Sequence, residues 1–312
     1  AHTPEGRIFH GSEMKKETVK AAWAAADSLS RKSIYVRTTF TSQQKKVKQA
    51  VVNICGLGLY ELSINGKKVG NSEFTPLISD YDKSVWYNTY DVTTLLQKGN
   101  NAIGVLLGNG FYNVQGGRYR KLLISFGPPT VRLQLTIHYE DGTSQTVASD
   151  KTWKYDFSPV TFNCIYGGED YDAREEQKGW NMAKFNDTLW NQVVVQEGPK
   201  GVLRPQIAAP VAIMEHYSPI SATHLPDSLL AAASKSTKRK VDASAIVLDM
   251  GQNLAGFPEI TVKGKKGQTV TLLVAESLTP EGACNQRQTG RQHYYQYTLK
   301  GDGEETWHPR FS

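Results

Sequence analysis

The sequence predicts an all-β protein made of two consecutive antiparallel β-sandwich (jelly-roll-like) domains, preceded by a short helical N-terminal segment. Two observations lead to this prediction. Many short segments alternate apolar and polar residues with a period of two, and Gly, Asn and Asp turns separate these segments. Strand and helix patterns do not alternate along the chain, so a doubly wound α/β sheet is not expected.

The length of 312 residues exceeds what one ordinary core fills and favours two domains. Residues 1–33 are assigned to the N-terminal segment, whose only helix pattern is the Ala-, Lys- and Glu-rich stretch 13–26. Residues 34–200 form the first sandwich. Residues 201–245 are predicted to form an extended connection. Residues 246–312 are predicted to be the start of a second sandwich domain, which is truncated in this chain.

The clearest strand is TVRLQLTIHY, residues 130–139, which an Asp141-Gly142 turn leads back. Its inward positions are predicted to be Val131, Leu133, Leu135, Ile137 and Tyr139. A strand over 34–40 opens the first sandwich. A further strand carries Tyr60, Leu62 and Ile64 on one face and ends at Asn65-Gly66, a dipeptide typical of tight hairpin turns.

The last residues predict a hairpin of two aromatic-rich strands around Gly301-Asp302-Gly303. Its buried positions are Tyr295, Tyr297 and Leu299 before the turn and Glu305, Trp307, Pro309 and Phe311 after it. Because no turn follows Phe311, we expect the strand to continue in a longer protein. Without that continuation, the edge at Trp307 and Phe311 is expected to be frayed or poorly packed.

The composition argues against several partners. The formal charge of +6 comes from Lys-rich runs at 43–49, 235–240 and 263–266, which are typical of solvated loops and strand edges, so no nucleic acid is expected. No apolar run reaches about 18 residues, so no membrane span is expected. The three cysteines are widely spaced and the seven histidines are scattered, so we predict no metal ligands and no disulfide framework.

The densest polar cluster is YGGEDYDAREEQKGW, residues 166–180. Two of its carboxylates could serve as the acid and base of a glycosidase. Alternatively, Asp172 and Arg174 lie two apart and pair locally. We favour the structural interpretation, because a run of charged residues does not promise the burial that shifts a pKa. No catalytic residue is predicted in this chain.

The loop 108–119, GNGFYNVQGGRY, is a candidate carbohydrate site. Aromatic rings that stack on a sugar, next to amide and guanidinium donors, are the chemistry of such a site. The candidate carbohydrate-binding residues are Asn109, Phe111, Tyr112, Asn113 and Arg118. The alternative is a rim loop whose aromatic residues pack into the core, and composition alone favours that alternative.

Eight pieces of the sequence occur in the order found in one known family. The run from residue 74 to residue 112 resembles the N-terminal β-sandwich of bacterial α-L-rhamnosidases, glycoside hydrolase family 78. Its matching pieces are 87–93 (YNTYDVT), 96–101 (LQKGNN) and 107–112 (LGNGFY), with Phe111 where the family has Trp. The later matches are YDAR at 171–174, WNMAKFNDTLW at 180–190, LDMGQNLAGF at 248–257, AESLTPEG at 275–282 and WHPRFS at 307–312.

This resemblance implies the non-catalytic N-terminal portion of an enzyme that cleaves terminal α-L-rhamnosyl bonds with inversion. In the family, two glutamates on a following (α/α)6 barrel act as acid and base, and no residue of this chain matches them. The implied partners are rhamnose-containing glycans or glycosides and the catalytic domain of the same protein. An alternative is a stand-alone carbohydrate-binding β-sandwich protein, which the continuation of the gene past Ser312 would decide.

Some members of the family carry a calcium-dependent, rhamnose-binding sandwich module. Its calcium ligands match no residues of this sequence one by one, so no cofactor is predicted, although calcium stays an alternative. The residues do not define the compartment. A periplasmic or extracellular location would suit an enzyme that scavenges glycans.

Overall fold

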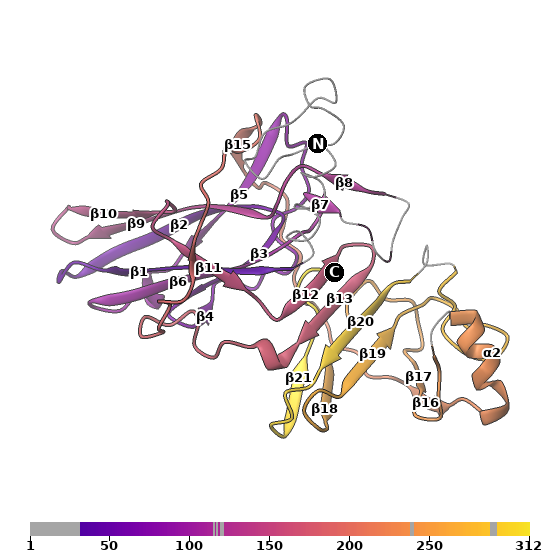
Figure 1. Ribbon diagram of the computed structural model, residues 1–312. Helices are drawn as coiled ribbons and strands as arrows, with labels where there is room; N and C mark the ends of the chain where they lie inside the picture. The colour runs from indigo at the N-terminus through magenta and orange to yellow at the C-terminus, as the bar shows by residue number, and fades with distance from the viewer. Residues whose placement is uncertain (1–31, 115, 117, 119–121, 238–239, 288–291) are drawn as a thin grey trace, which may run out of the picture.

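The structure is a computed structural model that describes residues 32–114, 116, 118, 122–237, 240–287 and 292–312. The helix predicted over 13–26 lies outside the described residues. The predicted all-β class is confirmed, since strands make up nearly all the regular structure of the described part (Figure 1). The described helical elements are α2 (Asp227–Thr237) and the 3₁₀ turns η1 (Thr93–Leu95) and η2 (Ala173–Glu175).

Two sheets enclose the first core. One has the order β14 (Asn191–Gln192), β11 (Lys154–Phe157), β1 (Ile34–Thr41), β6 (Asn100–Gly108), β3 (Leu59–Ile64), β4 (Lys67–Lys68). The other has the order β10 (Ser144–Ala148), β9 (Thr130–Tyr139), β2 (Val47–Leu57), β5 (Ser84–Asp91), β15 (Val202–Pro205). A small pair, β7 (Asn113–Val114) with β8 (Ile124–Ser125), lies beside them.

The predicted strand alternation holds in this sandwich. In β9, Leu133, Leu135, Ile137 and Tyr139 are buried in the core that also contains residues of β2, β3 and β6. The predicted turns are present too, because Asn65 and Gly66 have φ angles of 51° and 82°, which carry β3 into β4. Asn65 also donates from its side chain to the Leu95 carbonyl at 2.9 Å, so the turn is fixed to the neighbouring η1.

The second core lies under a four-stranded sheet with the order β12 (Val160–Cys164), β13 (Gly168–Asp172), β20 (Tyr294–Thr298), β19 (Thr269–Leu273). Two ribbons accompany it: β18 (Ile260–Lys263) with β21 (Glu304–Trp307), and β16 (Ser221–His224) with β17 (Ile246–Asp249). Strand β13 pairs with β20 in parallel, as β15 does with β5. The predicted ranges 34–200 and 246–312 therefore share a sheet, and the boundaries between them stay a prediction.

The predicted C-terminal hairpin is wrong, although its burial pattern is confirmed. Strand β20 lies between β13 and β19, whereas β21 pairs with β18 in another sheet. The turn carries the chain across the core, where Trp307 stacks on Tyr297 with ring centroids 5.4 Å apart. The alternation 305, 307, 309, 311 faces inward as expected. The two-residue alternation in the sequence thus predicted which side chains are buried, but it did not predict which strand pairs with β21.

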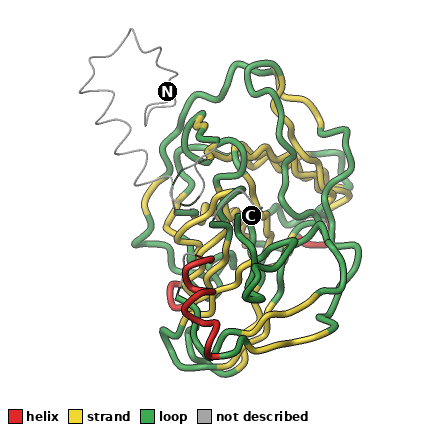
Figure 2. Tube along the Cα trace, turned by 90° about the vertical axis from the view of Figure 1, so that its right-hand side faces the viewer, coloured by secondary structure: helices red, strands yellow, loops and turns green. Residues whose placement is uncertain are grey.

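The expected fraying of the C-terminal edge is also wrong. Trp307 is 3% exposed and Phe311 is 1% exposed. The Phe311 ring packs with Tyr35, Leu59 and Leu106 of the first sandwich. It fits there because Gly108 has no Cβ, which would collide with the ring. The C-terminus accordingly lies in the middle of the molecule, between its two groups of strands (Figures 1 and 2).

A helix within 201–245 was not anticipated, so the expectation of an extended connection is wrong for that stretch. Helix α2 directly follows Pro226 and has Asp227 in its first turn, where a negative charge is favourable. Leu230 and Ala233 of the helix pack against Leu225 and Ala283, so tertiary burial stabilises a short helix.

A comparison of Gly168 with Gly142 tests how closely the backbones of β13 and β20 approach each other. Their φ angles, 89° and 84°, give similar backbone strain on mutation to Ala. A Cβ at Gly142 would meet nothing within 4 Å, whereas one at Gly168 would collide with the backbone carbonyl of Tyr294. We expect Gly142→Ala to lower the free energy of unfolding by about 1–2 kcal/mol and Gly168→Ala by about 1–3 kcal/mol more.

Urea unfolding measures both variants. Equal losses for Gly168→Ala and Gly142→Ala would contradict the close approach of β13 to Tyr294.

Candidate functional site

The most buried carboxyl group among the described residues lies where the C-terminal segment meets β13. Glu169 is fully buried, and both of its oxygens accept a hydrogen bond from the Arg310 backbone N–H, at 3.0 and 3.1 Å. One oxygen also accepts from the Phe311 N–H at 2.9 Å. A buried carboxylate is tolerated only when donors surround it. Glu169 therefore fixes the path of residues 310 and 311.

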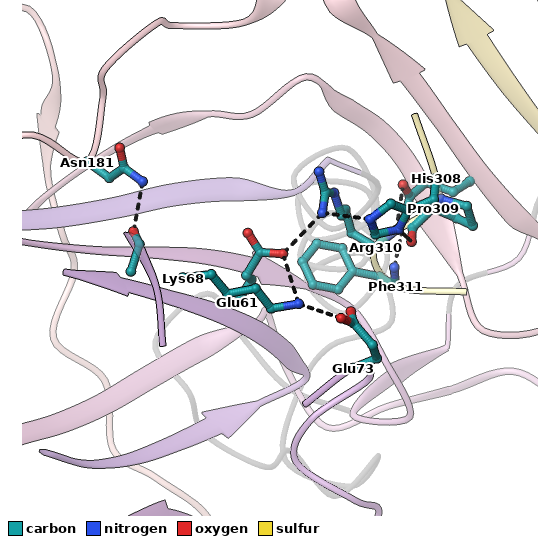
Figure 3. Close-up of polar contacts among 10 residues, drawn as sticks. Glu61, Lys68, Glu73, Asn181, His308, Pro309, Arg310 and Phe311 are labelled. Atoms are coloured by element: carbon teal, nitrogen blue, oxygen red, sulfur yellow. Dashed lines mark hydrogen bonds and ion pairs between the residues drawn. The ribbon is translucent and has the colours of Figure 1, made fainter. Parts of the chain in front are cut away.

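Arg310 extends this contact to the first sandwich (Figure 3). Its Nη1 donates to Glu61 Oε2 at 3.3 Å, and Lys68 Nζ lies 3.8 Å from the same oxygen. Lys68 also binds Glu73 Oε1 at 2.5 Å. Two positive and two negative groups alternate, so the network is balanced and links β3 and β4 to the C-terminal segment. Such a balanced network suits a joint between elements better than a charged substrate site.

His308 is held as a neutral imidazole. The guanidinium of Arg310 can only donate, so Nε2 of His308 accepts its hydrogen bond at 3.2 Å. Nδ1 then carries the proton and donates to the Pro309 carbonyl at 3.0 Å. Burial, with Arg310 nearby, lowers the pKa of this imidazole. The ring stacks on Phe257, which meets Phe74 edge-on, so the imidazole is part of an aromatic row.

The pKa of Glu169 differs most from its usual value among the carboxyl groups with a resolved shift. Burial raises this pKa to about 8, although the backbone donors of Arg310 and Phe311 act in the opposite direction. A raised pKa in a buried acid is also found in general acids of hydrolases. Here the carboxyl faces two backbone N–H groups, which is the geometry of a structural clamp.

The rest of the acidic cluster is paired locally, as the structural interpretation predicted. Asp172 binds Arg174 through both oxygens, at 2.8 and 2.6 Å, and caps η2 by accepting the Arg174 backbone N–H. Asp170 forms an ion pair with Arg118. Glu176 binds Lys300 at 2.9 Å. The burial of Glu169 was not predicted, because it depends on residues 310 and 311, which are distant in sequence.

Three of the predicted sugar-contact residues are buried. Asn109 donates from its side chain to the Asn163 carbonyl at 3.0 Å and accepts from the Asn113 side chain at 2.8 Å. The Tyr112 ring packs edge-on against Tyr81 with centroids 5.0 Å apart. These contacts agree with the alternative of a rim loop packed into the core.

The other two predicted residues are partly exposed as whole residues, although the Arg118 side chain is only 8% exposed. Phe111 is half-buried and meets Tyr166 edge-on at 5.9 Å. The Arg118 guanidinium lies 3.5 Å from the Tyr294 ring centroid and donates to the Tyr294 carbonyl at 3.0 Å. Arg118 thus helps to fasten the loop to β20. Sugar contact by this loop stays a prediction.

Asn113 also lines a cavity of about 840 Å³ between the sheets of the first sandwich. Most lining side chains are apolar, among them Leu57, Val85, Val131 and Trp153. Among the described residues, no group of three or more His, Cys, Asp or Glu side chains could hold a metal ion. The same part of the chain has no helix long and apolar enough to cross a membrane.

Two family models match consecutive parts of the chain. Residues 45–215 match the alpha-L-rhamnosidase N-terminal domain, and residues 239–312 match the bacterial alpha-L-rhamnosidase concanavalin-like domain. The chain belongs to the α-L-rhamnosidase family. The family resemblance derived from the sequence motifs is therefore confirmed.

Rhamnosidase relatives cover nearly the whole chain. An alpha-L-rhamnosidase of Formosa agariphila is 37% identical over 86% of the chain, and one of Streptomyces avermitilis is 34% identical over 97% of it. The chain spans 28% of the length of each. Among solved structures, the α-L-rhamnosidase of Dictyoglumus thermophilum has a TM-score of 0.79 and 33% identity over 90% of the chain and 29% of its own. The Streptomyces avermitilis rhamnosidase complexed with L-rhamnose has a TM-score of 0.77 and 33% identity over 90% of the chain and 26% of its own.

The pKa of Glu169 makes the stability of this rhamnosidase chain depend on pH. The unfolded carboxyl has a pKa near its usual 4.5 and the folded one near 8, so the folded protein binds the extra proton between these values. The free energy of unfolding is expected to fall as the pH rises through that window, by at most about 1.4 kcal/mol per pH unit. Glu169→Gln is expected to remove this slope.

Urea unfolding between about pH 6.5 and 8, above the usual histidine pKa, measures the slope. Glu169→Gln also loses one accepting oxygen, which lowers stability at every pH by about 1–3 kcal/mol, so the slope is the readout. The exposed Glu175→Gln is the control and is expected to keep the wild-type slope. The same slope in wild type and Glu169→Gln would contradict the raised pKa.

Proposed function

We propose that this chain is the non-catalytic N-terminal portion of an α-L-rhamnosidase that hydrolyses terminal α-L-rhamnosyl bonds with inversion. Its two sandwiches buttress the catalytic domain. The observation that carries this proposal is the pair of consecutive family matches in a chain that spans 28% of the relatives named alpha-L-rhamnosidase. A rhamnose-containing glycan or glycoside is the proposed substrate, in line with the related structure that is complexed with L-rhamnose.

The hydrogen-bond partners of the acidic side chains support a non-catalytic role for this portion of the protein. Inverting hydrolysis needs two carboxyl groups about 6.5–9.5 Å apart, with room between them for sugar and water. Glu169 is instead occupied by the backbone of residues 310 and 311, and Asp172 by Arg174. A substrate would have to displace these partners before either acid could work.

The buttressing role is supported by the joint at Arg310. A network that spans β3, β4 and the C-terminal segment holds the two sandwiches as one support. A rigid support keeps a neighbouring domain in a fixed orientation, which is how a remote domain aids catalysis without touching substrate.

The activity proposal is tested by comparing the 312-residue chain with the full-length protein on a chromogenic α-L-rhamnoside. We expect hydrolysis by the full-length protein only, with β-L-rhamnose as the first product seen by NMR. Asp172→Asn in the full-length protein is expected to change the rate less than about twofold, because the group pairs with Arg174 away from the chemistry. Turnover by the short chain that Asp172→Asn abolishes would place catalysis in the acidic cluster.

The sugar-contact proposal for the loop at Asn109 rests on Phe111, whose half-buried ring makes only an aromatic contact among those described. Rhamnose titration followed by NMR shifts is expected to detect weak binding, which Phe111→Ala weakens about threefold to tenfold through loss of ring stacking. Binding is expected to be equal in EDTA and in calcium, because the proposal includes no cofactor.

Leu189→Ala is the control, since Leu189 is 95% exposed on a different segment. Unchanged affinity in Phe111→Ala and in Arg118→Ala would rule the loop out as the sugar site.

A further inference from the structure

The ribbon of β16 and β17 has one partly covered face and one open face. Val247 packs towards the cluster of Leu225 and Ala233, which also contains Ala283, so α2 and its neighbours cover the inner face at Val247, while Thr223 opposite it is exposed. Successive strand residues point to opposite faces. The outer face therefore carries Ile246 and Leu248, and the register places His224 and Ala222 opposite them.

The outer face is exposed, and apart from His224 it is apolar. Ile246 and Leu248 are each 52% exposed, and Ala222 is exposed as well. Ile220 is 72% exposed and continues this face, because its backbone N–H donates to the Asp249 carbonyl at 2.8 Å. We call these four residues, Ile220, Ala222, Ile246 and Leu248, the ribbon face. Just before it in the chain, Met214 is 86% exposed and Val211 and Ile213 are each 44% exposed.

A solvated strand of the same protein looks different. In β9 the outward residues are Arg132, Gln134, Thr136 and His138, which are all polar. An exposed apolar strand face is typical of a surface that another part of a protein covers. A ribbon of two strands is also marginal by itself in water, so the β16–β17 pair gains stability from a covering element.

We infer that the ribbon face is the docking surface for the part of the α-L-rhamnosidase polypeptide that lies outside these 312 residues. The chain spans 28% of its relatives' length, so more than two thirds of such a polypeptide is available to cover the face. The formal charge of +6 disfavours a second copy of the chain as the occupant, because like charges repel. This inference rests on the proposed function, and it assigns the buttressing contact to named residues.

Cysteine labelling in the full-length protein tests the inference. Leu248→Cys is compared with Leu189→Cys, a matched leucine that is 95% exposed and lies on another segment. A maleimide is expected to label the cysteine at 248 at least tenfold more slowly than the one at 189 in the full-length protein. In the 312-residue chain, the two cysteines are expected to react within about threefold of each other, because both are exposed there.

Ala222→Cys is the second variant, since it adds a single thiol to the same face and disturbs the fold least. Equal labelling of positions 248, 222 and 189 in the full-length protein would overturn the inference. The inference would also be overturned if the cysteine at 248 were protected from the maleimide in the 312-residue chain and this protection disappeared on dilution. That result would indicate that a second copy of the chain covers the face. Rhamnoside hydrolysis by the unmodified full-length protein is measured separately, so a failure of the proposed activity is distinguished from a failure of the docking surface.

Discussion

The buried carboxylate of Glu169 is the constraint on which the joint between the two sandwiches depends. A carboxyl group without solvent needs hydrogen-bond partners, and the chain supplies them from the backbone of Arg310 and Phe311, which are 141 and 142 residues away in sequence. If Arg310 and Phe311 moved away, the buried Glu169 side chain would lose the backbone N–H groups that donate to it. The Phe311 ring is consequently held over Gly108 of the first sandwich. One buried acid thus determines where the C-terminal segment runs.

This clamp makes two ranges of sequence into one physical unit. Strand β13 belongs to the range of the first sandwich, yet its sheet is completed by β20 and β19 from the second. Arg310 then connects the same segment to Glu61 of β3. Because each contact requires the others to be in place, we expect the two sandwiches to loosen together when the clamp is lost, as neighbouring groups in one network do.

Local patterns predicted much of this fold, but not its long-range pairing. The alternation in 130–139, the Asn65-Gly66 turn and the inward face of 305–311 all follow from the period of a strand and from turn chemistry, and all are present. The partner of β21 is not encoded in that period, so the predicted hairpin was wrong. The burial of Glu169 and the helix α2 were missed for the same reason, since both depend on residues distant in sequence.

The same limit applies to the candidate sites. Aromatic and amide residues around Asn109 have the composition of a sugar site, but Asn109 and Asn113 bind each other and Tyr112 lies in a core. Composition cannot distinguish a side chain that faces a ligand from one that faces its own fold. Exposed side chains that pack against no other part of the fold are therefore the better guide to a binding surface. In this chain the exposed large apolar side chains include Ile220, Ile246 and Leu248 of the ribbon face, which supports contact with more protein.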